Sequence, residues 1–191
     1  MPALTSDCFY WVKDDALSPE FCQSLIDRFE SCPDIAEGTT LNGYSHLKRS
    51  TDLCVSGRED FKEEDQTLYL SLTLNMREYL SQLKYRPWRH GLRDSGYNVQ
   101  RTKPGEGFDW HNDFYATTTQ NELRVLTFIW YLNDVDEGGE TEFVNGVVIT
   151  PRVGRLAVFP AEFTAAHRGV TPVSGTKWIA TGWFHQSITP S

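Results

Sequence analysis

Three side chains in this sequence have the types and spacing expected of a metal site. His111 and Asp113 lie two residues apart in the stretch FDWHND, and His167 follows in the stretch FTAAHRG. Alternate residues of a β-strand point to the same face, so a strand here would aim His111 and Asp113 at one point in space. Two imidazoles and one carboxylate suit non-haem Fe(II) and leave coordination positions open, but the same ligands also suit catalytic zinc. The residues alone predict a metal site and leave iron or zinc open.

The choice of His167 as the third ligand follows from the small number of histidines. Only His167 and His185 lie downstream of Asp113. His185 stands beside the C-terminal tail, where we expect a solvated side chain, and we expect the same of His46 and His90. His167 lies just ahead of a Pro/Gly turn in the β-rich half of the chain, and it is therefore the preferred partner of Asp113.

A lysine opens an otherwise apolar and aromatic run. Lys177 is the first residue of KWIATGWF and lies ten positions after His167. A cation at the inner end of a hydrophobic pocket is unfavourable unless an anion meets it. A dicarboxylate that chelates the metal at one end would supply that anion, whereas a lysine that only snorkels at a strand end would reach solvent.

The elements that must position these residues change in character at about residue 96. Beyond this point the chain consists of short runs rich in β-branched and aromatic residues, separated by Gly/Pro turns, which is typical of a sandwich or barrel. These runs are GYNVQRT, LRVLTFIWYL, TEFV, GVVIT, RLAVF and KWIATGWF. We expect Trp11, Trp88, Trp130 and Trp178 to pack in the core or on a sheet.

The first half of the chain predicts two helices that pack on this sheet. Residues 18–32 have Ser18 as an N-cap and Pro19 at the first helical position, and apolar residues recur every fourth position. Residues 62–84 carry a second apolar stripe at helical spacing. Between them, residues 34–57 are rich in Gly, Ser, Thr and Asn, which predicts a loop with a short strand at 48–55. This loop is either a lid over the site or a surface excursion.

Composition limits the class of protein. The 191 residues favour one domain, with helical and strand support in 1–95 and a core in 96–185. A formal charge of −8 argues against a broad electrostatic grip on nucleic acid or an anionic membrane, so we expect neither as a partner. We see no secretory signal or membrane span, and we expect a cytoplasmic location.

The cysteine spacing bears on the redox state of the thiols. The four cysteines include no CxxC pair, and we expect reduced, structural thiols at Cys8, Cys22, Cys32 and Cys54. The sequence does not indicate an oligomeric state.

Three segments in order carry a family resemblance. YNVQRTKPGEGFDWHND, LRVLTFIWYLNDVDEGGETEF and GRLAVFPAEFTAAHRGVTPVSGTKWIATGWF together resemble the catalytic domain of the prolyl 4-hydroxylase-like 2-oxoglutarate and Fe(II)-dependent oxygenases. The resemblance is strong over about residues 97–184 and weaker towards the N-terminus. It implies a mainly β fold with flanking helices around a double-stranded β-helix (jelly-roll, cupin-like) core. It also implies that His111, Asp113 and His167 are the catalytic iron ligands.

The resemblance extends to the cosubstrate. Lys177 matches the basic residue that pairs with the distal carboxylate of 2-oxoglutarate, Tyr131 matches a tyrosine that can hydrogen-bond it, and Thr141 lies where the family lines that pocket. Trp183 falls on the same side of its strand as Lys177. Core packing is the alternative role for Tyr131, Thr141 and Trp183. Relatives often have tyrosine nine positions before the first iron histidine, where this chain has Thr102, so the contact with the cosubstrate can differ.

The activity implied is hydroxylation of a peptidyl proline. Fe(II), 2-oxoglutarate and O2 are the implied cofactors, succinate and CO2 the coproducts, and ascorbate a candidate reductant. The partner is then a proline-containing peptide or protein, and Arg49, Trp110 and Arg168 are candidates for the mouth of the site. Arg168 has the alternative of an ion pair that faces away from the metal. The same chemistry on a free amino acid or other small molecule, and a non-catalytic sensor that binds metal or 2-oxoglutarate, remain alternatives.

Overall fold

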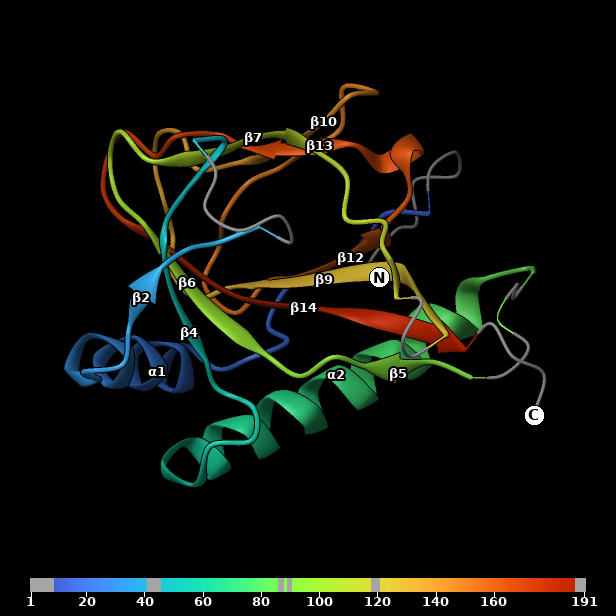
Figure 1. Ribbon diagram of the computed structural model, residues 1–191, viewed down its shortest axis with the longest axis horizontal. Helices are drawn as coiled ribbons and strands as arrows, with labels where there is room; N and C mark the ends of the chain where they lie inside the picture. The colour runs from blue at the N-terminus through green and yellow to red at the C-terminus, as the bar shows by residue number, and fades with distance from the viewer. Residues whose placement is uncertain (1–8, 41–45, 86–87, 89–90, 118–120, 188–191) are drawn as a thin grey trace.

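The computed structural model describes residues 9–40, 46–85, 88, 91–117 and 121–187, and two facing antiparallel sheets form its centre (Figure 1). The larger sheet runs in the order β1 (Trp11–Lys13), β12 (Leu156–Pro160), β9 (Glu122–Tyr131), β14 (Lys177–Ser187), β6 (Asn98–Thr102), β4 (Thr51–Cys54) and β2 (Ala36–Glu37), while β5 (Arg93–Asp94) pairs with β14 and β8 (Ala116–Thr117) with β9. The smaller sheet runs in the order β11 (Val148–Ile149), β10 (Thr141–Phe143), β13 (His167–Gly169), β7 (Gly107–His111) and β3 (Lys48–Arg49).

Two α-helices cover the outer face of the larger sheet (Figure 1). Helix α1 (Pro19–Ser31) begins where its cap predicts: the Ser18 side chain accepts a hydrogen bond from the Phe21 amide, and Pro19 occupies the first turn. Helix α2 (Lys62–Gln82) follows a 3-10 turn, η1 (Glu59–Phe61). The predicted helices at 18–32 and 62–84 are confirmed to within two residues at each end.

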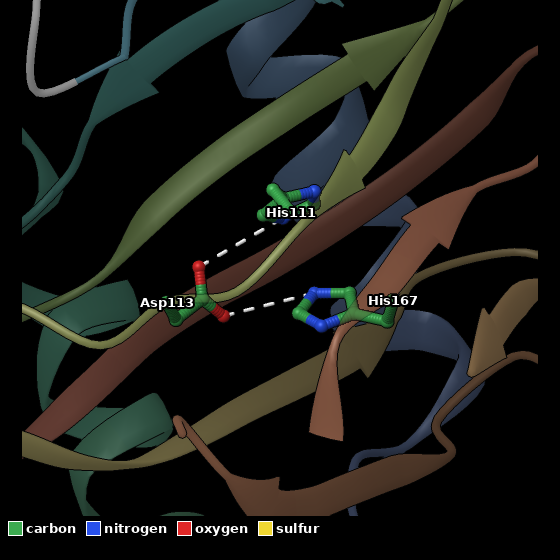
Figure 2. Close-up of side chains that lie close together, drawn as sticks. All are labelled: His111, Asp113 and His167. Carbon is green, nitrogen blue, oxygen red and sulfur yellow. Dashed lines mark ion pairs between the residues drawn. The ribbon is translucent and has the colours of Figure 1, made fainter. Parts of the chain in front are cut away.

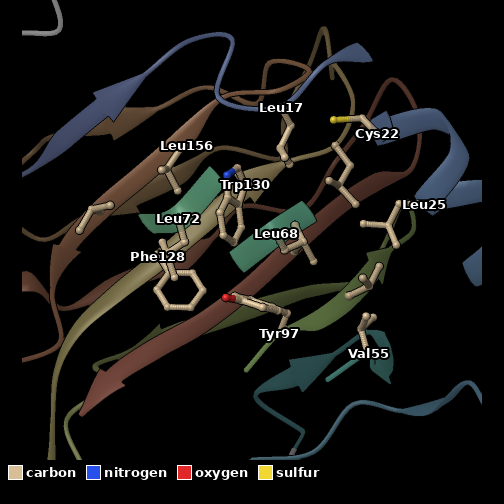
Figure 3. Packing of buried hydrophobic residues seen from close by; sticks show 14 of the residues in the cluster. Leu17, Cys22, Leu25, Val55, Leu68, Leu72, Tyr97, Phe128, Trp130 and Leu156 are labelled. Atoms are coloured by element: carbon tan, nitrogen blue, oxygen red, sulfur yellow. The ribbon is translucent and has the colours of Figure 1, made fainter. Parts of the chain in front are cut away.

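The main hydrophobic core lies between these helices and the larger sheet (Figure 3). Strand β9 shows how the sequence builds it, because Leu126, Phe128 and Trp130 alternate along the strand and all face the helices, where each is at most 1% exposed. Leu68 and Leu72 of α2 meet them from the other side. Trp11 is also fully buried here, and Trp88 and Trp178 pack against this core, as predicted for these tryptophans.

The intervening residues of β9 face the smaller sheet. Ile129 and Tyr131 join a second apolar cluster with Phe143, Phe159 and Ala165, which fills the space between the sheets on the side of β10 and β12. A short 3-10 turn, η2 (Phe163–Ala165), leads into β13 there. Towards β6, β4 and β3 the space between the sheets is open, and the candidate site lies in it.

The segment at 34–57 is more ordered than its composition suggests. Within its described part, β2 and β4 belong to the larger sheet and β3 to the smaller, with Ser50 as the one residue between β3 and β4. The short strand predicted at 48–55 is therefore confirmed, but this part of the chain is a wall that joins both sheets rather than a plain loop. Residues 41–45 lie outside the described residues.

Strands from the first half also extend both sheets. β1, β2, β4 and β5 lie in the larger sheet and β3 in the smaller, so residues before 96 contribute to the sheets as well as covering them. No helix in the described part of the chain is long and apolar enough to cross a membrane.

Candidate active site

The predicted triad comes together where β7 ends and β13 begins (Figure 2). His111 ends β7, His167 begins β13, and the two residues are cross-strand partners. Asp113 lies two residues beyond the end of β7, where its amide donates to the Ala161 carbonyl at 3.1 Å. One ligand atom of each of His111, Asp113 and His167 lies within 4.8 Å of the others. Pairing of β7 with β13 brings the 54-residue separation between Asp113 and His167 down to side-chain contact.

The orientation of the two imidazoles is fixed by their own backbone. His111 Nδ1 lies 2.7 Å from the Asp109 carbonyl oxygen and His167 Nδ1 lies 3.0 Å from that of Ala165. A carbonyl can only accept, so each Nδ1 carries the proton and each Nε2 presents a lone pair. The two Nε2 atoms face Asp113 at 3.8 and 3.7 Å, which is too long for a hydrogen bond.

This arrangement fits a metal cation. Three acceptors converge with no hydrogen between them, which is unfavourable unless a cation lies at their centre. Thr127 Oγ1 donates to Asp113 Oδ2 at 2.7 Å and holds the carboxylate in place. Two neutral imidazoles and one carboxylate, with no fourth protein ligand among the described residues, are the donor set of a 2-His-1-carboxylate iron site with open positions.

The protonation states agree with this role. Burial lowers the pKa of His111 well below its usual value, and the neighbouring His167 lowers it further. Burial acts to raise the pKa of Asp113, but His167, His111 and the Thr127 hydroxyl more than offset it, so the pKa lies below the usual range. At neutral pH His111 is therefore neutral and Asp113 ionised, which are the forms that bind metal.

Lys177 lies at the inner end of the same space. It is the first residue of β14, it is 5% exposed, and its Nζ donates to the Gly139 carbonyl at 2.9 Å. No carboxylate of the described residues lies within 4 Å of this ammonium. Burial lowers the pKa of Lys177 to about 8, with a smaller opposite effect from Glu140. An anion bound beside Lys177 would reverse that shift.

The other predicted cosubstrate residues surround this end. Tyr131 is fully buried and its hydroxyl donates to Thr141 Oγ1 at 2.7 Å. Thr141 lines the cleft, whereas Tyr131 lies behind it and is not among the lining residues. Thr102 pairs with Lys177 across β6 and β14 and also lines the cleft. Trp183 lines it further along β14, on the same side as Lys177, as predicted.

The cleft that joins these groups has a volume of about 880 Å³. That volume is in the range of sites for small ligands, and it exceeds what a five-carbon dicarboxylate fills. Its lining includes a polar wall from β4 and β6, formed by Asp52, Asn98, Gln100 and Thr102. The triad and Lys177 both line this one cleft.

Several lining residues were not predicted. Arg124 lies over the Trp183 ring, 3.8 Å from its centroid, and also 5.6 Å from that of Tyr115. Thr127 could have been found from sequence, because it stands two and four residues before Ile129 and Tyr131 on the inward face of β9. Arg124 interrupts an apolar run, which is a weaker signal of the same kind.

The weaker sequence expectations have mixed outcomes. Arg49 lines the cleft, but Trp110 and Arg168 do not. Arg168 pairs with Glu142 at 2.6 Å and lies over the Trp110 ring, so its alternative as an ion pair facing away from the metal is confirmed.

The histidines and cysteines outside the triad also differ from one another. The expectation of a solvated His185 is wrong: its side chain is 10% exposed and lies 3.8 Å from Glu122, because β14 continues past it and pairs with β9. His46 is exposed at the cleft, and His90 lies outside the described residues. Cys22, Cys32 and Cys54 are free thiols, as expected, and Cys8 lies outside the described residues.

Comparison with known proteins finds a family that the second half of the chain resembles. The sequence profile described as the 2OG-Fe(II) oxygenase superfamily matches residues 97–185, which include the triad and Lys177. Residues 97–185 of this chain are therefore similar to the 2OG-Fe(II) oxygenase superfamily. This similarity implies Fe(II), 2-oxoglutarate and O2 as cofactors, and His111, Asp113 and His167 form a donor set that fits the metal.

Two curated relatives of this chain are plant proteins. Probable prolyl 4-hydroxylase 9 of Arabidopsis thaliana is 26% identical over 195 residues, which cover 86% of this chain and 64% of the relative. Prolyl 4-hydroxylase 13 of the same plant is 30% identical over 113 residues, covering 46% of this chain and 41% of the relative. The chain therefore spans less than two thirds of the length of both relatives.

Solved structures confirm the predicted fold. A viral collagen prolyl hydroxylase from Paramecium bursaria Chlorella virus-1, in a 2-oxoglutarate complex, matches with a TM-score of 0.67 at 21% identity and covers 96% of this chain and 99% of that one. A prolyl hydroxylase from Trichoplax adhaerens, in complex with a hypoxia inducible factor peptide, has a TM-score of 0.74 at 18% identity over 94% and 84% of the two chains. The mainly β class with a jelly-roll core and flanking helices is confirmed.

Proposed function

We propose that this oxygenase hydroxylates a peptidyl proline and converts 2-oxoglutarate to succinate and CO2 as it does so. One observation carries the chemistry: a metal-ready triad and a buried lysine without a carboxylate partner within 4 Å among the described residues line the same cleft. A metal site alone would not need the lysine, and an anion site alone would not need three converging acceptors.

His111, Asp113 and His167 would hold Fe(II), which with bound 2-oxoglutarate supplies the oxidising power to place one atom of O2 in succinate and the other in a C–H bond. The residues around the metal site orient its ligands. Thr127 keeps the Asp113 carboxylate aimed at the metal, and the Nδ1 contacts keep both Nε2 lone pairs there.

Lys177 would bind the distal carboxylate of 2-oxoglutarate. The acid has two charged ends, and Lys177 at one end of the cleft matches the carboxylate that the metal does not take. The Thr141 hydroxyl lies beside it and is oriented by Tyr131, which donates to it. Ile129 and Ile179 add an apolar lining that keeps water away from the reacting centre.

Peptidyl proline is the substrate class best supported. The curated relatives are named prolyl 4-hydroxylases, and the cleft mouth is lined by the exposed rings of Phe114 and Tyr115 and by Arg124 over Trp183. Aromatic grooves suit proline-rich segments because such segments are already extended and lose little entropy on binding. Arg124 would donate to carbonyl oxygens of the bound peptide.

Ascorbate would act as a reductant that restores Fe(II), and dependence of long-term turnover on ascorbate tests that point.

The test is anaerobic reconstitution with Fe(II) and 2-oxoglutarate, followed by oxygen and a set of proline-rich peptides. We expect succinate in amounts matching a mass gain of one oxygen atom on a proline. Succinate without any peptide change would refute the peptidyl substrate and leave a small-molecule oxygenase. Metal binding without succinate, with every peptide and free amino acid tried, would refute the oxygenase and favour a sensor. Activity with Zn(II) in place of Fe(II) would refute the iron chemistry.

A further inference from the structure

The two metal-binding histidines differ in how the surrounding protein holds them. His167 is enclosed by the aromatic core, with the ring centroids of Phe159 and Phe143 at 4.9 and 5.4 Å and a side chain 6% exposed. His111 is the last residue of β7 and its side chain is 17% exposed. His111 therefore depends on fewer neighbours for its orientation.

Among the described residues, two rings contact the His111 imidazole: the His167 ring, 4.3 Å away and tilted by 56°, and the Phe108 ring, which makes the closer contact. The Phe108 ring stacks on the His111 ring with centroids 3.5 Å apart and planes 14° from parallel. Two flat faces in contact leave the imidazole little freedom to turn about its χ2 angle, which decides where Nε2 points. The Nδ1 contact with the Asp109 carbonyl restrains the same rotation from the other edge of the ring.

Phe108 is itself supported from β3. Lys48 is its cross-strand partner, and the Lys48 Nζ lies 5.8 Å from the Phe108 ring centroid. Lys48 Nζ pairs with Asp52 at 2.6 Å and also donates to the Thr39 carbonyl at 3.3 Å. The Lys48 and Asp52 side chains are only 7% and 14% exposed.

The acceptor of this ion pair is fully engaged. Asp52 accepts hydrogen bonds from Ser50 Oγ at 2.7 Å and from Asn98 Nδ2 at 3.3 Å, in addition to that from Lys48. Lys48 lies on the smaller sheet and Asp52 and Asn98 on the larger, so the pair joins the two sheets across the corner at Ser50. A buried ion pair contributes little net stability compared with well-packed apolar residues, so stability alone does not explain it.

We propose that Phe108 and the Lys48–Asp52 ion pair are positioning residues that orient His111 for metal binding. The ion pair fixes Lys48 and β3, Lys48 and β3 fix Phe108, and Phe108 fixes the plane of the imidazole. The inference rests on the metal site of the proposed function. Lys48 and Asp52, which are far from the triad in sequence, would thereby orient His111 before the metal binds.

The experiment is titration of the metal-free protein with Co(II), followed by visible absorption, which reports metal affinity without any turnover. Supporting contacts behind a metal ligand typically contribute 10- to 100-fold in affinity. We expect Phe108→Leu to weaken Co(II) binding about tenfold or more. Phe108→Tyr keeps the flat ring and should bind Co(II) with the wild-type affinity. Tyr69→Leu, on the exposed face of α2, is the matched control and should bind as the wild type.

A second variant tests the ion pair. Lys48→Met combined with Asp52→Asn removes both charges without leaving one buried alone. We expect this double variant to bind Co(II) about threefold more weakly or worse, which is a smaller loss of affinity than that of Phe108→Leu. Unfolding curves establish that each variant is folded. Wild-type affinity in Phe108→Leu, or equal weakening in Phe108→Tyr and Phe108→Leu, would overturn the inference.

His111→Ala separates this inference from the proposed site. If His111→Ala weakens Co(II) binding and Phe108→Leu does not, the positioning role fails and the metal site stands. If His111→Ala has no effect on Co(II) binding, the metal site itself fails and the positioning role falls with it.

Discussion

Lys177→Met should make the cosubstrate-free protein more stable while it weakens the binding of 2-oxoglutarate. Lys177 is 5% exposed, and among the described residues its ammonium donates one hydrogen bond, to the Gly139 carbonyl. Burial lowers its pKa from 10.5 to about 8. Holding the charged form in the fold at pH 7 therefore costs about 3 kcal/mol relative to the unfolded chain. Loss of the hydrogen bond to Gly139 offsets about 1 kcal/mol of the gain.

The sign of the pH dependence gives the sharper test. Because the folded pKa lies below the unfolded pKa, the folded protein binds fewer protons, and the penalty is full below about pH 8 and disappears as pH rises towards 10.5. The stability advantage of Lys177→Met over the wild type should therefore fall by about 2 kcal/mol between pH 7 and pH 10.

Urea unfolding of metal-free protein across this range measures the difference directly. Lys103→Met, which removes an exposed lysine close to the end of β6, serves as the control and should show no such trend. Binding of 2-oxoglutarate to the metal-loaded variant should weaken about 100-fold, as expected when one partner of a buried charge pair is removed. An advantage that is absent at pH 7, or that grows with pH, would refute the account of Lys177 as a buried and uncompensated cation.

Three further predictions follow from the geometry of the triad and the core. His111→Ala or Asp113→Ala should abolish succinate formation, and full activity in either variant would contradict the assignment of the triad. Thr127→Val, which removes the hydrogen bond to Asp113, should weaken Co(II) binding about tenfold with little loss of fold, and unchanged affinity would show that Asp113 needs no such support. Trp130→Ala should lower the free energy of unfolding by about 3–5 kcal/mol in urea, because the side chain is fully buried between β9 and α2, and a loss under 1 kcal/mol would show that the core collapses to fill the space.

The parts of the fold that follow from local chemistry could be predicted from the sequence. Ser18 and Pro19 specify the start of α1 through contacts within a few residues, and the alternation in β9 specifies which face each side chain takes. The ligand types and their spacing were enough to select His111, Asp113 and His167.

The parts that depend on strand partners could not be predicted. The composition of 34–57 indicates a loop, but Lys48 joins the smaller sheet through β7 and Asp52 the larger through β6, and no local signal shows which partner each strand will find. The same holds for His185, which looks like a tail residue until β14 is seen to pair with β9 through Ser187. Phe108 carries no mark in the sequence that separates a core ring from one stacked on a metal ligand.

Strand β14 sets the distance between the two ends of the cleft. Lys177 and Trp183 lie six residues apart on its inward face, so the strand alone sets about 20 Å between the anion-binding end and the mouth. Strand β6 pairs with β14 from Lys177 to Thr181 and β9 pairs with it from Ile179 onwards, so this length is held in register by paired strands and no loop contributes to the spacing. A one-residue insertion between them would turn one of the two side chains to the helix-covered face. The sheet thus fixes the distance between the Lys177 end of the cleft and its mouth. The loops and edge strands around the mouth can change, and with them the specificity for the second substrate, without altering that distance.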